Sequence, residues 1–200
     1  MKRQPVIALL LLFMTFTAVA DEGIRFFEGT WAETLAKAKD ENRLIFLDAY
    51  ASWCGPCIQM AKNVFPQKEV GDFYNENFIP VKIDMEKGEG VAVAKLYNVR
   101  AYPTLLFINW RGELVHRAVG GRQAEAFIEL GKEALDDTRN FRSVESAYKN
   151  NPEDVNLMIA YAAMLKKTYD RSYNEIISGF MKDKPISLLL SETGWKIMTE

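Results

Sequence analysis

An apolar run that leads directly into a pair of cysteines constrains the fold of this chain more than any other feature. The run is Leu44–Tyr50, in which Asp48 is the one charged side chain, and Cys54 and Cys57 follow it. Such a run is typical of a strand buried on both faces, as in the centre of a mainly parallel sheet. Helical periodicity then begins at Cys57. The sequence therefore predicts a central strand, a tight turn and a helix.

Cys54 and Cys57 are the only cysteines among the 200 residues. A cysteine at the turn before a helix lies near unpaired backbone N–H groups and the positive end of the helix dipole, which favour a thiolate. Because Cys54 is nearer to that end, we expect it to attack disulfides, and Cys57 to resolve the mixed disulfide. As a structural cross-link the pair would stabilise the chain by only about 2 kcal/mol, since the closed loop is short. A redox function is the favoured interpretation.

The stretch Trp53–Cys57 resembles the active-site signature of the thioredoxin family, in the order of that family. The resemblance extends over roughly residues 40–136. Asp48 matches the buried acid of the family, Tyr102-Pro103 its cis-proline loop, and Gly120 the glycine that closes its last strand. The resemblance implies an α/β thioredoxin fold, with a mixed central sheet flanked by helices. It also implies a protein-disulfide reductase or, more generally, a thiol-disulfide oxidoreductase.

Asp48 is the side chain on which residues and resemblance agree. A carboxylate inside an apolar strand is costly to leave ionised, so we expect its pKa to be raised. The resemblance implies that it accepts the proton of Cys57; the alternative is a solvated, inert acid at a strand end. Many thioredoxins have a lysine where this chain has Pro80. We interpret Lys82 as out of phase with that position, which leaves the charge partner of Asp48 open.

The other candidate site residues surround the two sulfurs. Trp53 is expected to contact an incoming peptide, with simple core packing as the alternative. Gly55 and Pro56 are expected to keep the turn tight. This dipeptide between the two cysteines resembles that of the reducing thioredoxins. Pro103 resembles the cis-proline of the family and would leave Tyr102 to meet substrate. These five residues are the expected supporting and substrate-binding residues.

The N-terminal 20 residues predict export. Lys2 and Arg3 precede the uncharged run Val6–Ala20, and Ala18-Val19-Ala20 has the pattern of a cleavage site, as in a secretory signal. An uncleaved membrane anchor is the alternative, although the run is shorter than the roughly 20 apolar residues of a membrane span. We therefore expect a periplasmic or otherwise exported protein. A membrane thiol relay would have to supply its electrons, because cytosolic reductants do not reach that compartment.

Charge and motifs exclude several other functions. The formal net charge is −2 and basic residues are interspersed with acidic ones, which gives no support to nucleic-acid binding. His116 is the only histidine, so a zinc site would lack ligands, and nothing places it near a nucleophile as a hydrolase base. No organic cofactor motif is present. The expected substrates are disulfide-containing proteins.

We divide the chain into a signal peptide at 1–20, a thioredoxin-like domain at 21–137 and an all-helical C-terminal segment at 138–200. The expected strands are 24–27, 44–50, 78–84, 104–108 and 114–119. The expected helices are 31–40, one that begins at 57, 67–75, one through 91–97, 123–135, 141–148, one that starts at 151–154 and ends near 166–167, 169–181 and 186–198. The C-terminal helices are weakly similar to tetratricopeptide helices. They either dock on the domain, completing a core, or await a protein partner.

Two alternative functions remain open at the level of sequence. The C-terminal helices could make the protein a binding or assembly module in which the cysteine pair is a redox switch. The same enzyme could also work in reverse, as an oxidant that donates disulfides.

Overall fold

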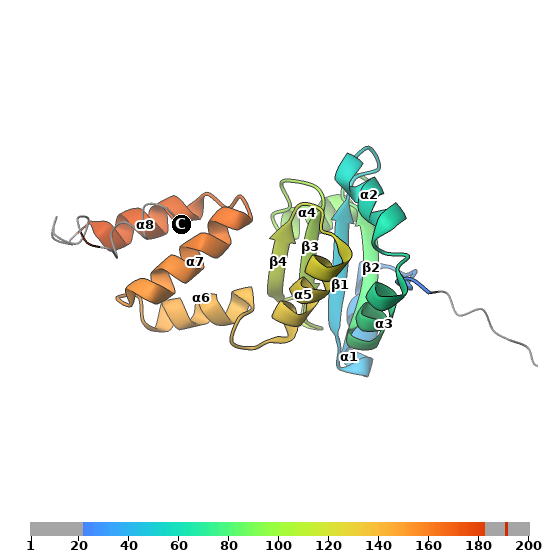
Figure 1. The fold of residues 1–200 in the computed structure, drawn as a ribbon, viewed down its shortest axis with the longest axis horizontal. Coiled ribbons are helices and arrows are strands. Elements are labelled where there is room, and N and C mark those ends of the chain that lie inside the picture. Colours follow the sequence, from blue (N-terminus) through green and yellow to red (C-terminus); the bar gives the residue numbers. More distant parts are fainter. Residues whose placement is uncertain (1–21, 183–190, 192–200) are drawn as a thin grey trace, which may run out of the picture.

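The computed structural model describes residues 22–182 and residue 191 (Figure 1). Within them, one sheet has the strand order β2-β1-β3-β4. β1 is parallel to β2 and antiparallel to β3, and β3 and β4 form an antiparallel hairpin. The sheet is mixed, as expected. The expectation that the central strand lies in a mainly parallel sheet is wrong, because β1 has one parallel and one antiparallel neighbour. The strands lie where the sequence predicted them: β1 (Leu44–Tyr50), β2 (Phe78–Asp84), β3 (Thr104–Ile108) and β4 (Leu114–Val119).

Helices cover both faces of the sheet. Successive side chains of β1 point to opposite faces, as the pleat of a strand requires. Phe46 faces one helical layer and Ile45 and Leu47 face the other, and all three are fully buried. The first layer consists of α2 (Gly55–Asn63), α3 (Lys68–Asn77) and α5 (Ala124–Leu135), and the second of α1 (Trp31–Glu41) and α4 (Gly90–Leu96).

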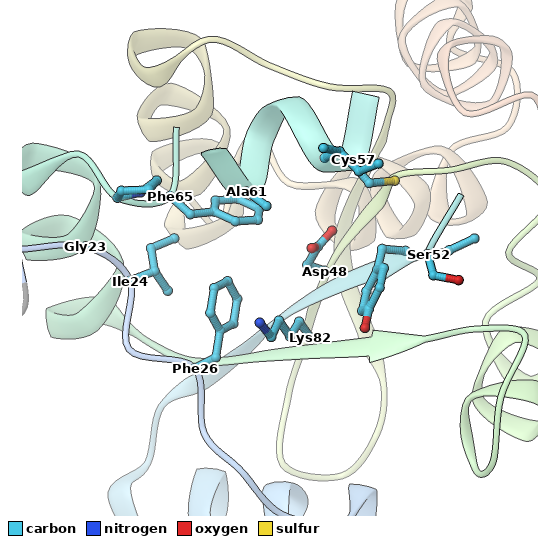
Figure 2. A pocket seen from close by; sticks show the side chains of 13 residues that line it. Gly23, Ile24, Phe26, Asp48, Ser52, Cys57, Ala61, Phe65 and Lys82 are labelled. Atoms are coloured by element: carbon cyan, nitrogen blue, oxygen red, sulfur yellow. The ribbon is translucent and has the colours of Figure 1, made fainter. Parts of the chain in front are cut away.

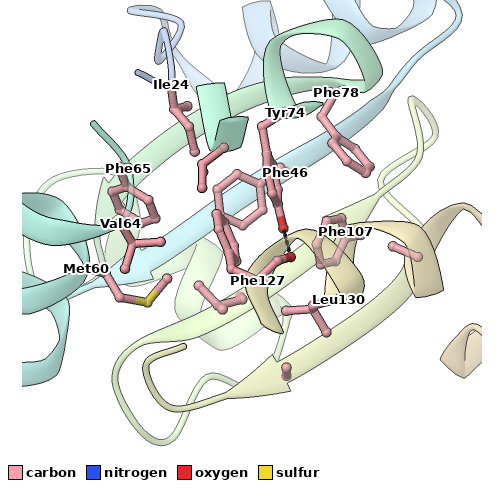
Figure 3. Close-up of a cluster of buried hydrophobic side chains, with 14 residues drawn as sticks. Ile24, Phe46, Met60, Val64, Phe65, Tyr74, Phe78, Phe107, Phe127 and Leu130 are labelled. Atoms are coloured by element: carbon pink, nitrogen blue, oxygen red, sulfur yellow. Dashed lines mark hydrogen bonds between the residues drawn. The ribbon is translucent and has the colours of Figure 1, made fainter. Parts of the chain in front are cut away.

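An aromatic cluster fixes α3 and α5 on the sheet (Figure 3). Tyr74 of α3 stacks on Phe127 of α5 with ring centroids 4.1 Å apart, and Phe46 of β1 packs edge-on against both rings. The Tyr74 hydroxyl donates to the Phe127 carbonyl oxygen at 2.7 Å, so this buried polar group is satisfied. Burial of each ring stabilises the fold by roughly 1.5–3 kcal/mol. The cluster therefore holds β1 rigidly beneath the helices.

The capping box predicted for α1 is present. The Thr30 hydroxyl accepts from the backbone N–H of Glu33 at 3.2 Å, and the Glu33 carboxylate accepts from the Thr30 N–H at 2.8 Å. These hydrogen bonds satisfy donors that a helix start leaves unpaired. The bonds that the Thr30 N–H and hydroxyl donate to the Glu33 carboxylate lower its pKa.

The strand expected at 24–27 is wrong. This segment is extended, but only the N–H groups of Ile24 and Phe27 bond to other backbone, to the carbonyl oxygens of Phe65 and Pro80, each at 2.8 Å. Pro80 lies on β2 at the edge that faces the segment and has no N–H to donate. A regular ladder of alternating donors and acceptors cannot form there.

Three helices extend from the β4 edge of the sheet: α6 (Phe141–Asn150), α7 (Val155–Lys167) and α8 (Ser172–Met181). α6 packs against β4, and Phe141 forms a small core with Tyr161 and Leu165 of α7, to which Leu114 of β4 adds. The segment therefore docks on the domain. Whether it also binds a partner stays a prediction.

The start expected for α7 at Asn151-Pro152 is wrong. The helix begins at Val155, and Asp154 is its N-cap, whose carboxylate accepts from the N–H groups of Asn156 at 2.8 Å and Leu157 at 3.2 Å. One carboxylate thus satisfies two unpaired donors. α8 likewise starts at Ser172, three residues later than expected.

The signal peptide at 1–20 lies outside the described residues, as does the helix expected at 186–198 apart from Ser191. The domain boundary at 137/138 stays a prediction. In the part of the chain that the structure describes, no helix is both long and apolar enough to cross a membrane.

Candidate active site

The two cysteines lie at the N-terminus of α2, where they form a disulfide with an S–S distance of 2.06 Å. Cys54 is the N-cap, and its sulfur accepts from the backbone N–H of Cys57 at 3.2 Å. The helix starts at Gly55, two residues earlier than expected. Proline is compatible with the first turn because its missing N–H would be unpaired there anyway, so Pro56 does not delay the helix.

Both cysteines are nearly buried in the disulfide. Cys54 is 3% exposed and Cys57 5%, so Cys54 is not the more accessible residue in this state. Tyr50 and Tyr102 pack against the pair and cover it. The preference for Cys54 as the attacking thiolate therefore rests on its position at the N-cap, where backbone N–H groups and the helix dipole favour negative charge.

Asp48 lies on the face of β1 that points towards α2, with its carboxyl group beneath Cys57 (Figure 2). The residue is 4% exposed, and Oδ1 has no hydrogen-bond partner among the described residues. Burial raises the pKa of Asp48 to about 7, against the opposing positive charge of Lys82. The carboxyl group can thus hold or release a proton near neutral pH. The alternative of a solvated strand-end acid is wrong.

Lys82 is the cation that faces Asp48. The two residues are register partners on the parallel strands β1 and β2. Our interpretation of Lys82 as out of phase with Pro80 is wrong, because residues two apart along a strand point to the same face. The Lys82 ammonium also lies over the ring of Phe26, 5.4 Å from its centroid. Phe26 therefore helps to hold the charge partner of Asp48.

A pocket of about 320 Å³ connects these groups. Asp48, Cys57 and Lys82 line it, and Gly23, Ile24 and Phe26 form part of its wall. The pocket is roomy enough for water and has charged groups to bind it. This pocket is the route that we expect for proton exchange between solvent and the buried carboxyl group.

Trp53 stands at the rim of the site and is 68% exposed, so its core-packing alternative is wrong. Its indole Nε1 donates to Oε2 of Glu86 at 2.8 Å, and its ring meets Tyr102 edge to face at 5.9 Å. The Tyr102–Pro103 peptide bond is cis, as in the family loop that it resembles. The structure thus brings Trp53 and Tyr102 together beside the sulfur pair.

Two glycines border the site in different ways. Gly120 has φ +90°, a conformation that glycine adopts without strain, and its N–H donates to the Pro103 carbonyl oxygen at 2.8 Å. This hydrogen bond ties the end of β4 to the cis-proline loop. A Cβ at Gly55 would meet no atom within 4 Å, so packing does not demand glycine there.

Comparisons with known proteins agree with this geometry. Residues 31–135 match the profile of a thioredoxin-like domain. The chain is 36% identical over 102 residues to Thioredoxin H4 of Arabidopsis thaliana, covering 51% of this chain and 81% of that protein.

Solved structures give the same result. The solution structure of a putative disulphide-isomerase from Bacteroides thetaiotaomicron is 46% identical, with 60% of this chain and 98% of that chain covered and a TM-score of 0.53. A thioredoxin from Thermus thermophilus, 24% identical with a TM-score of 0.51 over 57% of this chain and 89% of that chain, shares the fold.

The chain belongs to the thioredoxin-like family. It is a thiol-disulfide oxidoreductase whose redox pair is Cys54 and Cys57. The matched region ends at residue 135, so α6–α8 lie outside the thioredoxin-like match.

His116 does not belong to the site of this thioredoxin-like domain. Its buried imidazole accepts, through Nδ1, a hydrogen bond from the N–H of Phe141 at 3.1 Å, at the start of α6. Burial lowers the pKa of His116 to about 4, so it is neutral at pH 7. Within the described residues, no three histidine, cysteine or acidic side chains are grouped to hold a metal ion.

Sequence reasoning missed Glu86, Phe26 and the facing position of Lys82. Glu86 follows the end of β2, and the cysteine turn follows the end of β1. Because β1 and β2 are parallel, their carboxyl ends meet at one edge of the sheet, which is the signal that could have placed Glu86 beside Trp53.

Proposed function

We propose that the protein is exported and reduces or isomerises protein disulfides through the Cys54-Gly55-Pro56-Cys57 dithiol. The observation that carries the proposal is Cys54 at the N-cap of α2, with Cys57 one turn later above the buried Asp48. The similarity to the putative disulphide-isomerase, over nearly all of that chain, supports an activity on protein disulfides.

The reaction starts from the reduced pair. The Cys54 thiolate attacks one sulfur of a substrate disulfide, that S–S bond breaks, and the second substrate sulfur leaves as a thiolate. Asp48 takes the proton of Cys57, whose sulfur then attacks Cys54 and releases the reduced substrate. Two electrons pass to the substrate, and the Cys54–Cys57 disulfide remains.

Regeneration requires a reductant of the same chemistry. In an exported protein the electrons come from a membrane thiol relay, which reduces the Cys54–Cys57 disulfide by a further exchange. The basic, apolar and small-residue pattern of residues 1–20 supports export. Sequencing the N-terminus of the expressed protein tests this proposal: we expect the periplasmic form to start at Asp21, and a cytosolic form that keeps Met1 contradicts export.

Mixed-disulfide trapping tests the reductase reaction. In Cys57→Ser, Cys54 can attack a substrate but nothing resolves the product, so disulfide-linked complexes should accumulate and should dissolve on treatment with dithiothreitol. In Cys54→Ser the complexes should be absent. Equal trapping by the two variants contradicts the assignment of Cys54 as the attacking residue.

A second candidate is a binding or assembly module that uses the C-terminal helices. It is favoured by the position of α6–α8 outside the matched region. Deletion of residues 138–200 separates the two functions. A reductase should still reduce insulin with a kcat/KM within about threefold of the full chain, whereas a binding module should lose its partner. The shortened chain must first show cooperative unfolding, because the deletion uncovers β4.

A further inference from the structure

We propose that Trp53, Tyr102 and Glu86 form a subsite for a cationic side chain, lysine or arginine, that flanks the reacting disulfide of the protein substrate. This inference rests on the proposed function and names a feature of its substrates. The exchange steps proposed above involve Cys54, Cys57 and Asp48, and none of them needs the negative charge of Glu86. A charged and aromatic cluster beside the two sulfurs therefore has another role.

The aromatic part of the subsite is fixed but open. The Trp53 indole is held by the 2.8 Å hydrogen bond from Nε1 to Glu86 and by edge-to-face contact with Tyr102, at an interplanar angle of 75°. With 68% of the residue exposed, a face of the indole is free. The face of a tryptophan ring attracts ammonium and guanidinium groups, which can lie within about 6 Å of its centroid.

Glu86 supplies the negative charge. The indole Nε1 of Trp53 donates a hydrogen bond to Oε2 of Glu86, and no other hydrogen bond or ion pair to this carboxylate is found among the described residues. Asp84, the neighbouring acid, is already paired with Lys87 at 2.9 Å, and Lys87 also donates to the Ser52 hydroxyl at 3.2 Å. Glu86 is therefore the rim carboxylate that remains available to a cation from outside.

Tyr102 connects this charge to the reacting atoms. It packs against the Cys54 and Cys57 pair and precedes the cis Pro103. Burial raises the pKa of Tyr102, and the negative charges of Glu86 and Asp84 raise it further. A substrate joined to Cys54 has its flanking residues about 3.3 Å per residue from the linked cysteine, within reach of this cluster.

The alternative is that Glu86 only orients the indole. Glu86→Gln distinguishes the two, since its amide oxygen can still accept from Trp53 Nε1 while the charge is removed. Glu86 is exposed, so neither this variant nor Glu86→Lys disturbs the core. Glu175→Gln on α8 is the matched control, because it removes the same charge from an exposed position on a helix that Figure 1 shows far from α2.

The test measures kcat/KM for reduction of three disulfide peptides that differ only in whether arginine, glutamine or glutamate flanks each cysteine. Each value is divided by the rate of the same peptide with dithiothreitol, which removes the intrinsic effect of charge on the disulfide. We expect the wild type to prefer the arginine peptide over the glutamine peptide about fivefold, mainly through KM, with less preference at 1 M salt. Glu86→Gln should reduce this ratio to below about twofold, Glu86→Lys should favour the glutamate peptide, and Glu175→Gln should match the wild type.

Three results overturn the inference, and they separate failure of the subsite from failure of the proposed function. Equal normalised kcat/KM for the arginine and glutamine peptides, or a preference that survives in Glu86→Gln, rejects the subsite while the reductase function stands. Failure of the folded, reduced wild type to reduce any of the peptides rejects the proposed function, and the subsite with it.

Discussion

At the scale of single residues, the site depends on a carboxyl group that the fold makes costly to ionise. Asp48 is buried between β1 and α2, and only the Lys82 charge opposes the effect of burial on its pKa. A group that is expensive to the folded state and still occupies the centre of the sheet is expected to serve a chemical role. Its cost is measurable as a dependence of stability on pH.

Asp48→Asn should stabilise the oxidised protein at pH 8. The folded pKa of about 7 exceeds the ordinary value of 3.8, so the native state binds the extra proton and stability falls as pH rises between these values. Removing the charge should raise the free energy of unfolding at pH 8 by about 2 to 4 kcal/mol and have little effect near pH 4. Urea unfolding at both pH values checks this. Asp137→Asn, at an exposed position, is the control and should show no such difference.

Lys82→Met should raise the pKa of Asp48 above about 7, because the positive charge that favours the carboxylate is lost. Titration of the Asp48 carboxyl carbon by NMR measures the shift directly. Lys82→Arg keeps the charge and should leave the titration near its wild-type position. An Asp48 pKa that is the same in Lys82→Met as in the wild type would contradict the claim that the charge of Lys82 favours the carboxylate.

At the scale of elements, β1–β4 and α1 could be predicted because their signals are local: apolar runs, turn residues and a capping box. The segment at 24–27 could not, since its failure to form a strand depends on Pro80, which is distant in sequence. The sequence pattern placed the start of α7 at Asn151-Pro152, whereas Asp154 is the N-cap of the helix. Glu86 was missed because its partner Trp53 becomes a neighbour only once β1 and β2 pair.

The junction between β4 and α6 includes one buried hydrogen bond that pH can break, from the N–H of Phe141 to Nδ1 of His116. Replacing His116 with phenylalanine should leave the N–H of Phe141 unpaired and destabilise the protein at pH 7 by about 1–3 kcal/mol. His116→Asn, which keeps an acceptor, should recover part of this loss. Thermal unfolding of the three proteins at pH 7 measures the difference, and equal melting temperatures would show that the bond does not hold α6.

At the scale of the whole molecule, Asp48 and His116 impose opposite pH dependences. The folded pKa of His116, about 4, lies below its ordinary 6.5, so its contribution is present above pH 6.5 and is lost as pH falls towards 4. Asp48 has the reverse slope over the same range. At a pH where the group is protonated in only one of the folded and unfolded states, the free energy of unfolding changes by about 1.4 kcal/mol per pH unit.

We therefore expect the stability of the wild type to be nearly flat between pH 5 and 6.5. Asp48→Asn should lose stability towards pH 5, because only the His116 slope remains, and His116→Asn should gain it. Chemical unfolding of the three proteins across this range tests the cancellation. A steep wild-type profile would contradict it.

In residues 22–182, the C-terminal helices and the redox pair lie on different sides of the sheet. α6–α8 extend from β4, whereas Cys54 and Cys57 lie on α2 at the carboxyl end of β1 (Figure 1). Among the described residues, these helices therefore add a second surface to the thioredoxin-like domain and do not cover the cysteine pair. The reduction potential of the Cys54/Cys57 pair decides whether the protein reduces its substrates or oxidises them.

The most direct test of the central claim is the reduction potential of the Cys54/Cys57 pair in the protein without residues 1–20, measured against glutathione buffers. A reductant that resembles the thioredoxins predicts a value near about −270 mV, and an isomerase a value near about −180 mV. A value near about −120 mV, that of a strong disulfide donor, would contradict the account and make Cys54 part of an oxidant.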